Sequence, residues 1–204
     1  LLNLKNVIFI NNKNFIYYDN EFILGKSDPN NDVFDILHFA NDRKQIVIPS
    51  FIKIIEAYAF LICYSLKKLV FLKDSQLTDI GEKAFYDSYI ECISIPKHVK
   101  KIGKSAFVYS KIKFIDFEDD CELEFIGFNA FANSNITCLC IPSNVKIIER
   151  CTFFDCRQLQ IIEIAENSKL TSLNSNEFMN AKCIMIPPKI SKKLFQSKKT
   201  YFFD

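Results

Sequence analysis

The sequence has no tryptophan, and its 204 residues include only four glycines and two histidines. Four glycines cannot supply a G-x-G-x-x-G or P-loop phosphate cradle, and the G-x-S-x-G nucleophile motif is absent. The two histidines, His38 and His98, are far apart, and no C-x-x-C pair indicates a zinc site. The sequence therefore predicts no catalytic residues, no cofactor and no metal.

Long hydrophobic runs are also missing. The longest, Ala57–Tyr64, has eight residues, whereas a helix that crosses a bilayer needs about 18–20. The formal net charge of +2 gives no overall basic surface for nucleic acid, and the lysine-rich segment 189–199 is typical of a solvated terminus. We expect no membrane span in this chain and no nucleic-acid partner. The chain starts at Leu1 with no charged-then-apolar leader, which favours a processed or excerpted sequence.

Phenylalanine, in contrast, is abundant, with 21 residues. A phrase of about 23 residues recurs six times, and its mark is a small or degenerate residue followed by phenylalanine. The six pairs are Ala59-Phe60, Ala84-Phe85, Ala106-Phe107, Ala130-Phe131, Thr152-Phe153 and Glu177-Phe178. An aliphatic residue precedes each phenylalanine at a fixed distance: Ile55, Ile80, Ile102, Ile126, Ile148 and Leu173. Such a period predicts a solenoid, because one coil cannot bury its own apolar face.

Apolar-x-apolar pairs predict seven short strands: Ile46/Ile48, Leu69/Phe71, Ile93/Ile95, Ile115/Phe117, Leu139/Ile141, Ile162/Ile164 and Ile184/Ile186. Alternation points both members of a pair to one face, and the fixed phase brings successive strands together in a parallel sheet, roughly 4.8 Å apart. We therefore expect a mainly β solenoid with this sheet on one side and loops or short turns on the other.

Two coil lengths alternate, and the charge of the connecting arms alternates with them. The basic arm Lys97–Lys104 is followed by the acidic arm Glu118–Glu124 in the next coil. Stacked arms of opposite charge would favour the correct register, although each exposed ion pair contributes only ~0–1 kcal/mol. The alternative, an acidic cation site, lacks an Asp-x-Asp-x-Asp-Gly loop.

The sequence divides into three segments. Residues 1–45 show the repeat poorly, and their apolar stretches Val7–Ile10, Phe15–Tyr18 and Phe22–Leu24 predict short antiparallel strands of a cap, followed by a degenerate first coil near Val33-Phe34. Residues 46–188 form the solenoid of about six coils. Residues 189–204 form a basic C-terminal segment.

The phrases IPKHVKKIGKSAF (residues 95–107) and IPSNVKIIERCTF (residues 141–153) resemble the BspA-like leucine-rich repeat family, over about residues 33–188. The resemblance implies a leucine-rich-repeat solenoid, a location at the cell surface or outside the cell, and adhesion or ligand binding without catalysis. Glycines 81, 103 and 127 fit the family's Ile-Gly position. Glu56, Glu149 and Asn174 replace glycine there, so we expect those turns to avoid positive φ.

Most of the eight cysteines are interpreted as free thiols. Cys63 and Cys156 share the phase of serines in other coils, which favours buried packing. Cys92, Cys138 and Cys183 recur only in alternate coils, too far apart for disulfides. Two alternatives stay open at this point: a disulfide between Cys121 and Cys151, and metal binding by the C-x-C pair of Cys138.

The outward face of the strands is the candidate binding surface, because its middle is apolar and exposed apolar patches often mark interaction sites. Its residues are Phe114, Asp116, Cys138, Cys140, Ile161 and Glu163. The alternative is that a terminal segment or a second copy covers this face. We expect an interaction module for a protein or glycan on a host or neighbouring cell; the competing hypothesis is a structural, self-associating scaffold, including one inside the cell. Asn135, in the sequence Asn-Ile-Thr, is a predicted glycosylation site.

Overall fold

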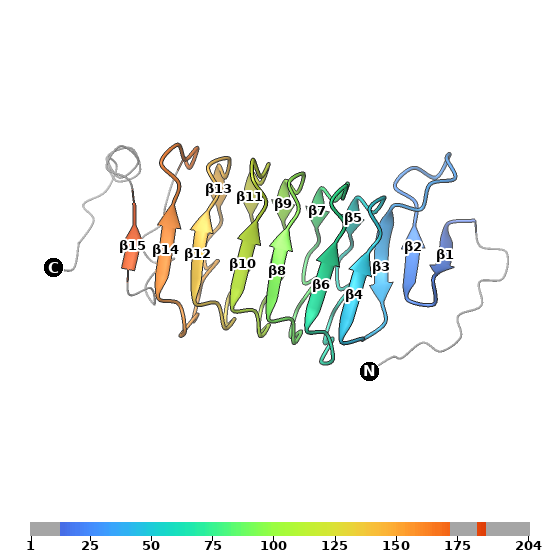
Figure 1. The fold of residues 1–204 in the computed structure, drawn as a ribbon, viewed down its shortest axis with the longest axis horizontal. Coiled ribbons are helices and arrows are strands. Elements are labelled where there is room, and N and C mark those ends of the chain that lie inside the picture. Colours follow the sequence, from blue (N-terminus) through green and yellow to red (C-terminus); the bar gives the residue numbers. More distant parts are fainter. Residues whose placement is uncertain (1–12, 172–182, 187–204) are drawn as a thin grey trace.

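The computed structural model describes residues 13–171 and 183–186. Figure 1 shows an elongated molecule in which short strands follow one another along the long axis, coil after coil. The described residues contain strands and turns but no helix. This arrangement is the predicted solenoid, in which each coil packs against its two neighbours.

The first side is a seven-stranded parallel sheet in the order β15-β14-β12-β10-β8-β6-β4. Its strands are β4 (Gln45–Ile48), β6 (Lys68–Phe71), β8 (Cys92–Ile95), β10 (Phe114–Phe117), β12 (Cys138–Ile141), β14 (Ile161–Ile164) and β15 (Cys183–Met185). All seven predicted strands are present. Residues at equal phase are paired, for example Ile115 with Ile93, and both are buried. The predicted phase is confirmed, and so is the inward facing from β4 to β14, whereas the predicted inward residue Ile184 of β15 is 38% exposed.

The second side carries a sheet of its own, in addition to the expected turns. This sheet has eight strands in the order β1-β2-β3-β5-β7-β9-β11-β13. The strands within the coils have two residues each: β5 (Ile54–Ile55), β7 (Asp79–Ile80), β9 (Lys101–Ile102), β11 (Phe125–Ile126) and β13 (Ile147–Ile148). They pair in parallel because the first sheet sets the distance between coils, which places these extended backbones within hydrogen-bonding reach.

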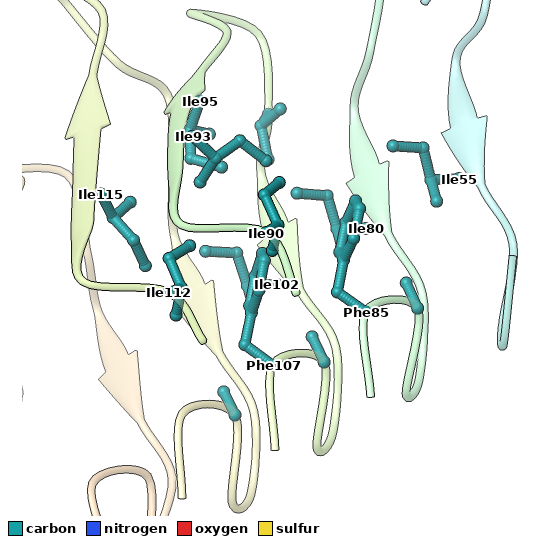
Figure 2. Close-up of a cluster of buried hydrophobic side chains, with 14 of the residues drawn as sticks. Ile55, Ile80, Phe85, Ile90, Ile93, Ile95, Ile102, Phe107, Ile112 and Ile115 are labelled. Atoms are coloured by element: carbon teal, nitrogen blue, oxygen red, sulfur yellow. The ribbon is translucent and has the colours of Figure 1, made fainter. Parts of the chain in front are cut away.

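The core between the two sheets contains a stack of phenylalanine rings. Figure 2 shows Phe85 and Phe107 lying inside the coils beneath a cluster of isoleucines that includes Ile80 and Ile102. Rings from successive coils lie with their centroids 4.8, 5.0, 5.4 and 5.7 Å apart, in the series Phe60, Phe85, Phe107, Phe131, Phe153. All five side chains are fully buried. The sixth predicted phenylalanine, Phe178, lies outside the described residues.

The segment between a second-sheet strand and the next first-sheet strand, such as residues 103–113, is called an arch here. Arches are joined by backbone hydrogen bonds although they contain no strand. The Phe107 N–H donates to the Ala130 carbonyl over 2.7 Å, and the Phe85 N–H donates to the Ala106 carbonyl over 2.8 Å. The buried backbone of each arch is therefore satisfied by the next coil.

The glycines of the coils serve close approach between backbones. None has a positive φ. A Cβ on Gly103 would lie 2.7 Å from the carbonyl carbon of Gly81, and one on Gly127 would lie 2.8 Å from that of Gly103. Glu56 and Glu149 avoid positive φ as expected, but so do the glycines that they replace.

Positive φ occurs at two other positions of each arch. They lie two and six residues after the position that glycine occupies in the Ile-Gly pair. Ser105 and Tyr109 illustrate it in one coil, with φ of 56° and 58°. The same two phases recur in the other arches, at Tyr58, Ile62, Lys83, Asp87, Asn129, Asn133, Cys151 and Asp155.

The N-terminal cap extends the second sheet with antiparallel strands. β1 (Phe15–Tyr18) pairs with β2 (Phe22–Gly25), and β2 pairs with β3 (Ile36–Ala40), which in turn lies parallel to β5. Two of the three predicted cap strands are confirmed, and Val7–Ile10 lies outside the described residues. β3 begins at Ile36, just after the Val33-Phe34 position near which the sequence predicts a degenerate first coil. The loop before it is anchored by its own side chains, so regular pairing starts only after Asp35.

Asp35 fastens this loop to the first coil. Its side chain is 1% exposed, and it accepts hydrogen bonds from the Ser27 N–H (2.9 Å) and hydroxyl (2.7 Å) while pairing with Lys53 at 3.0 Å. Burial acts to raise the pKa of Asp35, but the hydrogen bonds from Ser27 and Lys53 outweigh it and hold the pKa below its usual value. The carboxylate is therefore stabilised in its ionised form.

Substitution of Phe107 by alanine should lower the free energy of unfolding by about 3–5 kcal/mol, because it leaves a cavity in the middle of the ring stack. Phe154→Ala is the matched control, since this phenylalanine is 60% exposed and should cost under about 0.5 kcal/mol. Urea denaturation of both variants measures the difference. Equal losses in the two variants would contradict the stacked core.

Substitution of Asp35 by asparagine should cost about 1–3 kcal/mol at neutral pH, because charged hydrogen bonds are lost. Since the folded-state pKa is lowered, the stabilisation is fully present above the ordinary pKa of 3.8 and disappears as the pH falls through the folded value. The melting temperatures of the parent and of Asp35→Asn, measured between about pH 7 and 2, should therefore converge at the acidic end. A constant difference across this range would show that the charge of Asp35 contributes nothing.

Candidate functional site

The outward face of the first sheet has an apolar column at its centre. Phe114 in β10 is paired with Cys138 in β12, and Cys138 is paired with Ile161 in β14. Phe114 is 53% exposed and Ile161 is 41% exposed, and Cys138 is also exposed. Neighbouring strands lie roughly 4.8 Å apart, so the three side chains form one continuous apolar strip.

A second column with carboxylates runs beside this strip. Asp116, Cys140 and Glu163 are all exposed at the next outward position of the same three strands, and Cys140 is paired with Glu163. Burial raises the pKa of the Cys140 thiol, and the negative charge of Glu163 raises it further. The thiol is thus held in its neutral form between two negative charges. The structure places all six predicted residues on one open face.

The edge where the first-sheet strands begin carries a row of ion pairs. Glu91 bonds to Lys67 at 3.2 Å and to Lys113 at 3.4 Å, bridging three successive coils. The hydrogen bond from Lys67, followed by that from Lys113, lowers the pKa of Glu91. Two lysines and one glutamate leave this edge with a net positive charge, whereas the outward column of the strands carries the negative charges of Asp116 and Glu163.

The alternating arms do interlock, as their charges predict. His98 Nδ1 lies 2.9 Å from Glu122 Oε1, and the Lys97 N–H donates to Glu118 Oε2 over 2.9 Å. Lys146 continues the pattern with a 2.8 Å contact to Glu124 of the preceding coil, and this hydrogen bond lowers the pKa of Glu124. These contacts between arms therefore help to fix the register of successive coils.

A second surface, which the sequence analysis missed, lies on the outer edge of the arches and is called the arch edge here. It carries five of the eight tyrosines: Tyr58, Tyr64, Tyr86, Tyr89 and Tyr109. Tyr64 and Tyr89 lie 4.9 Å apart, and Tyr86 and Tyr109 meet edge-to-face at 5.6 Å. The recurrence of tyrosine four positions after Phe60 and Phe85 could have indicated this surface.

The arch edge also contains a hollow of about 320 Å³. Its lining residues are Tyr109, Asn133, Ser134, Asn135, Asp155, Arg157 and Gln158, from three successive arches. Arg157 Nε and Nη2 donate to the two oxygens of Asp155 at 2.9 and 3.0 Å, and the hydrogen bond from Arg157 lowers the pKa of Asp155. Asn135, the predicted glycosylation site, forms part of this wall, and its modification stays a prediction.

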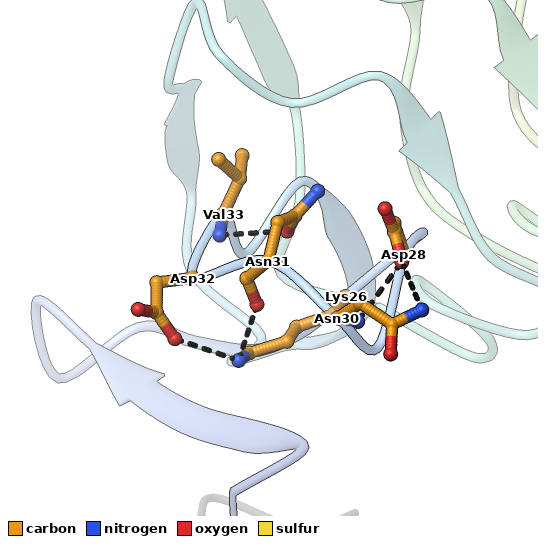
Figure 3. Close-up of polar contacts among 6 residues, drawn as sticks. All are labelled: Lys26, Asp28, Asn30, Asn31, Asp32 and Val33. Atoms are coloured by element: carbon orange, nitrogen blue, oxygen red, sulfur yellow. Dashed lines mark hydrogen bonds and ion pairs between the residues drawn. The ribbon is translucent and has the colours of Figure 1, made fainter.

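The loop before the first coil presents Asp28, Asn30 and Asp32 at alternate positions, a pattern that could suggest a cation site. Figure 3 shows that the ammonium group of Lys26 reaches the Asn31 carbonyl and Asp32, while Asp28 accepts hydrogen bonds from Asn30. Lys26 Nζ lies 2.6 Å from the Asn31 oxygen and 3.2 Å from Asp32 Oδ1. The ammonium group of Lys26 is therefore the cation that these oxygens bind. Within residues 13–171 and 183–186, no group of three or more His, Cys, Asp or Glu is placed to hold a metal.

The seven cysteines whose side chains are described are free thiols. Cys63 and Cys156 are buried, as predicted from their phase, and burial raises the pKa of Cys63 to about 12. Cys156 donates to the Phe131 carbonyl over 3.0 Å, which satisfies the thiol inside the core. Cys121 and Cys151, the pair that the sequence left open, do not form a disulfide.

The comparison with protein families matches six copies of the BspA type leucine rich repeat region, at residues 38–137 and 124–203. Among solved structures, the pneumococcal vaccine antigen PcpA is 34% identical over 63% of this chain and 32% of that protein, with a TM-score of 0.60. A leucine-rich repeat protein from Eubacterium ventriosum is 21% identical over 89% of this chain and 54% of its own, with a TM-score of 0.65.

The leucine-rich repeat protein of T. pallidum shares the fold, with 18% identity, a TM-score of 0.62 and coverage of 84% and 83% of the two chains. The present chain thus spans about a third of the pneumococcal antigen and about half of the Eubacterium protein. No curated protein sequence matches it significantly. In the part of the chain that the structure describes, no helix is long and apolar enough to cross a membrane.

A thiol-reactive dye should distinguish the surface cysteines from the core cysteines. In the folded protein, the exposed Cys92, Cys138 and Cys140 should react, and the rate at Cys140 should rise more than usual with pH because its pKa is raised. The buried Cys63 and Cys156 should react only after unfolding, because burial disfavours their thiolates. Unfolded, unreduced protein should yield at least the seven thiols described here. A single disulfide within the chain, which would leave six thiols, would overturn the assignment.

Proposed function

The chain belongs to the BspA-type leucine-rich repeat family, and from this membership we propose that it is a non-catalytic interaction module that binds a protein partner at a cell surface. The proposed binding surface is the outward face of the seven-stranded sheet, centred on Phe114, Cys138 and Ile161. Repeat solenoids present extended surfaces of this kind to their partners.

The observation that carries the proposal is the exposure of an apolar strip that folding does not require. The inward neighbours Ile115, Leu139 and Ile162 already fill the core of the same strands. Apolar side chains gathered on an open face are characteristic of interaction sites, whereas isolated ones are ordinary. Phe114 projects furthest in this strip, and a large aromatic at the centre of a patch is the type of residue that dominates binding energy.

The charges beside the strip indicate the chemistry of the partner. Asp116 and Glu163 lie on either side of Cys140, so this side of the patch is negative. A partner with an apolar centre and a lysine- or arginine-bearing rim would complement it.

The family and the likeness to a protein described as a pneumococcal vaccine antigen support a location at the cell surface. The proposal of adhesion follows from that location together with the open strand face. The expectation that the chain is not an enzyme is supported by its membership of a family of repeat proteins.

Phe114→Asp and Ile161→Lys should abolish capture of the partner from a cell-surface extract while leaving the melting temperature within about 2 °C of the parent. Both side chains are exposed, so a charge there is tolerated in the free protein but is costly against an apolar partner surface.

Two variants serve as controls. Phe154→Asp makes the same kind of change at an exposed phenylalanine on another surface, and Lys100→Glu alters a charged arm; both should retain binding. Normal capture by the two strand-face variants would refute the proposed surface. Sedimentation of the parent separates the competing hypothesis, since a dimer that Phe114→Asp dissociates would indicate self-association instead.

A further inference from the structure

We propose that the hollow on the arch edge is a second binding site, specific for a neutral, hydroxyl-rich ligand such as one sugar unit of a glycan. It lies outside the candidate protein-binding face, and it uses residues from three arches that the sequence spaces more than twenty positions apart. The proposal does not depend on the function proposed for the strand face.

Tyr109 supplies an aromatic wall for this ligand. Its side chain is 48% exposed, and its ring is held edge-to-face against Tyr86 at an interplanar angle of 84°. An aromatic ring fixed at the surface offers a large apolar contact at little conformational cost, with a polar hydroxyl at its tip. The carbon-bearing face of a sugar ring is suited to such contact.

The remaining walls offer hydrogen bonds of both kinds. Asn133, Asn135 and Gln158 carry amide groups that donate and accept, and Asp155 has further acceptor capacity beyond its two bonds to Arg157. A ligand with neighbouring hydroxyls can satisfy both types of group. An apolar ligand would leave these polar groups unpaired, which disfavours it.

The charge balance of the hollow argues for a neutral ligand. Arg157 and Asp155 are the only charged residues of the lining and are joined by two hydrogen bonds, so the lining has no net charge to attract an ionic ligand. The size also suits a small unit, because about 320 Å³ lies at the lower end of the range for ligand pockets. Tyr86 of the preceding arch continues the aromatic surface along the same edge.

The test uses protein expressed in bacteria, because a glycan attached to Asn135 would fill the hollow. Neutral oligosaccharides of mannose, galactose and N-acetylglucosamine are titrated against it by calorimetry and protein NMR, with sulfated oligosaccharides in parallel. At least one neutral series should bind with a dissociation constant of about 1 mM or tighter, and its affinity should be unchanged between ~50 and ~500 mM salt.

The variants are chosen to preserve the backbone. Tyr109 and Asp155 have positive φ, as does Asn133 at the same phase of the intervening arch, so asparagine is suited to both positions. Tyr109→Asn and Asp155→Asn should each weaken binding of the neutral sugar about tenfold or more without lowering the melting temperature. Phe154→Asn is the matched control. Phe154 precedes Asp155 in the same arch but is not among the residues that line the hollow, so this variant should bind normally.

Three outcomes would overturn the proposal: no binding of any neutral sugar, binding that Tyr109→Asn leaves unchanged, or binding of sulfated sugars alone that disappears at high salt. The strand-face variant Phe114→Asp should bind the sugar as the parent does. If it loses the sugar as well, the two surfaces are one site and the assignment to the hollow is wrong. If Phe114→Asp fails to capture the protein partner but binds the sugar normally, the present proposal stands.

Discussion

The distance between successive coils is the constraint on which the rest of the structure depends. Parallel strands pair at roughly 4.8 Å, and every other contact along the axis must accept that spacing. The phenylalanine centroids, at 4.8–5.7 Å, satisfy it with near-parallel rings, and Gly103 and Gly127 let the backbones approach where a Cβ would collide. Arches of nearly constant length follow, while the larger variation in length lies in the arms. Binding groups at the arm or arch surface can therefore change without disturbing the core.

Much of the fold could be predicted because the core residues repeat at a fixed phase. The pairs such as Ile93 and Ile95 revealed the strands, and the Ala-Phe pairs revealed the ring stack. The second sheet could not be found this way, since a strand of two residues, such as Lys101–Ile102, has no alternation to recognise. The glycine role was also missed, because sequence gives the residue type but not the approach of the neighbouring backbone. Asp35 became visible as an anchor only when Ser27 and Lys53 were seen around it.

The two candidate sites differ in how much of each could be predicted from the sequence. Residues of the strand face share the phase of the core pairs, so their common orientation followed from period-two alternation and the structure brings them together. The hollow draws on Tyr109, Asn133 and Asp155, which share one phase of the repeat, but this phase holds Ile62 in the first arch, and nothing in the core pattern indicates that it lines a hollow. Function placed on turns is carried by individual residues, whereas the scaffold is carried by the repeat.

The hydrogen bonds between coils run along the long axis, and this orientation determines how the molecule responds to force. Tension applied along that axis pulls the coils apart in the direction of their bonds, so the load falls on one interface at a time. An end coil would peel away and lengthen the chain before its neighbour yields, which dissipates work in steps and leaves the remaining coils folded. In the adhesive role proposed above, such a rod would lengthen in steps under load.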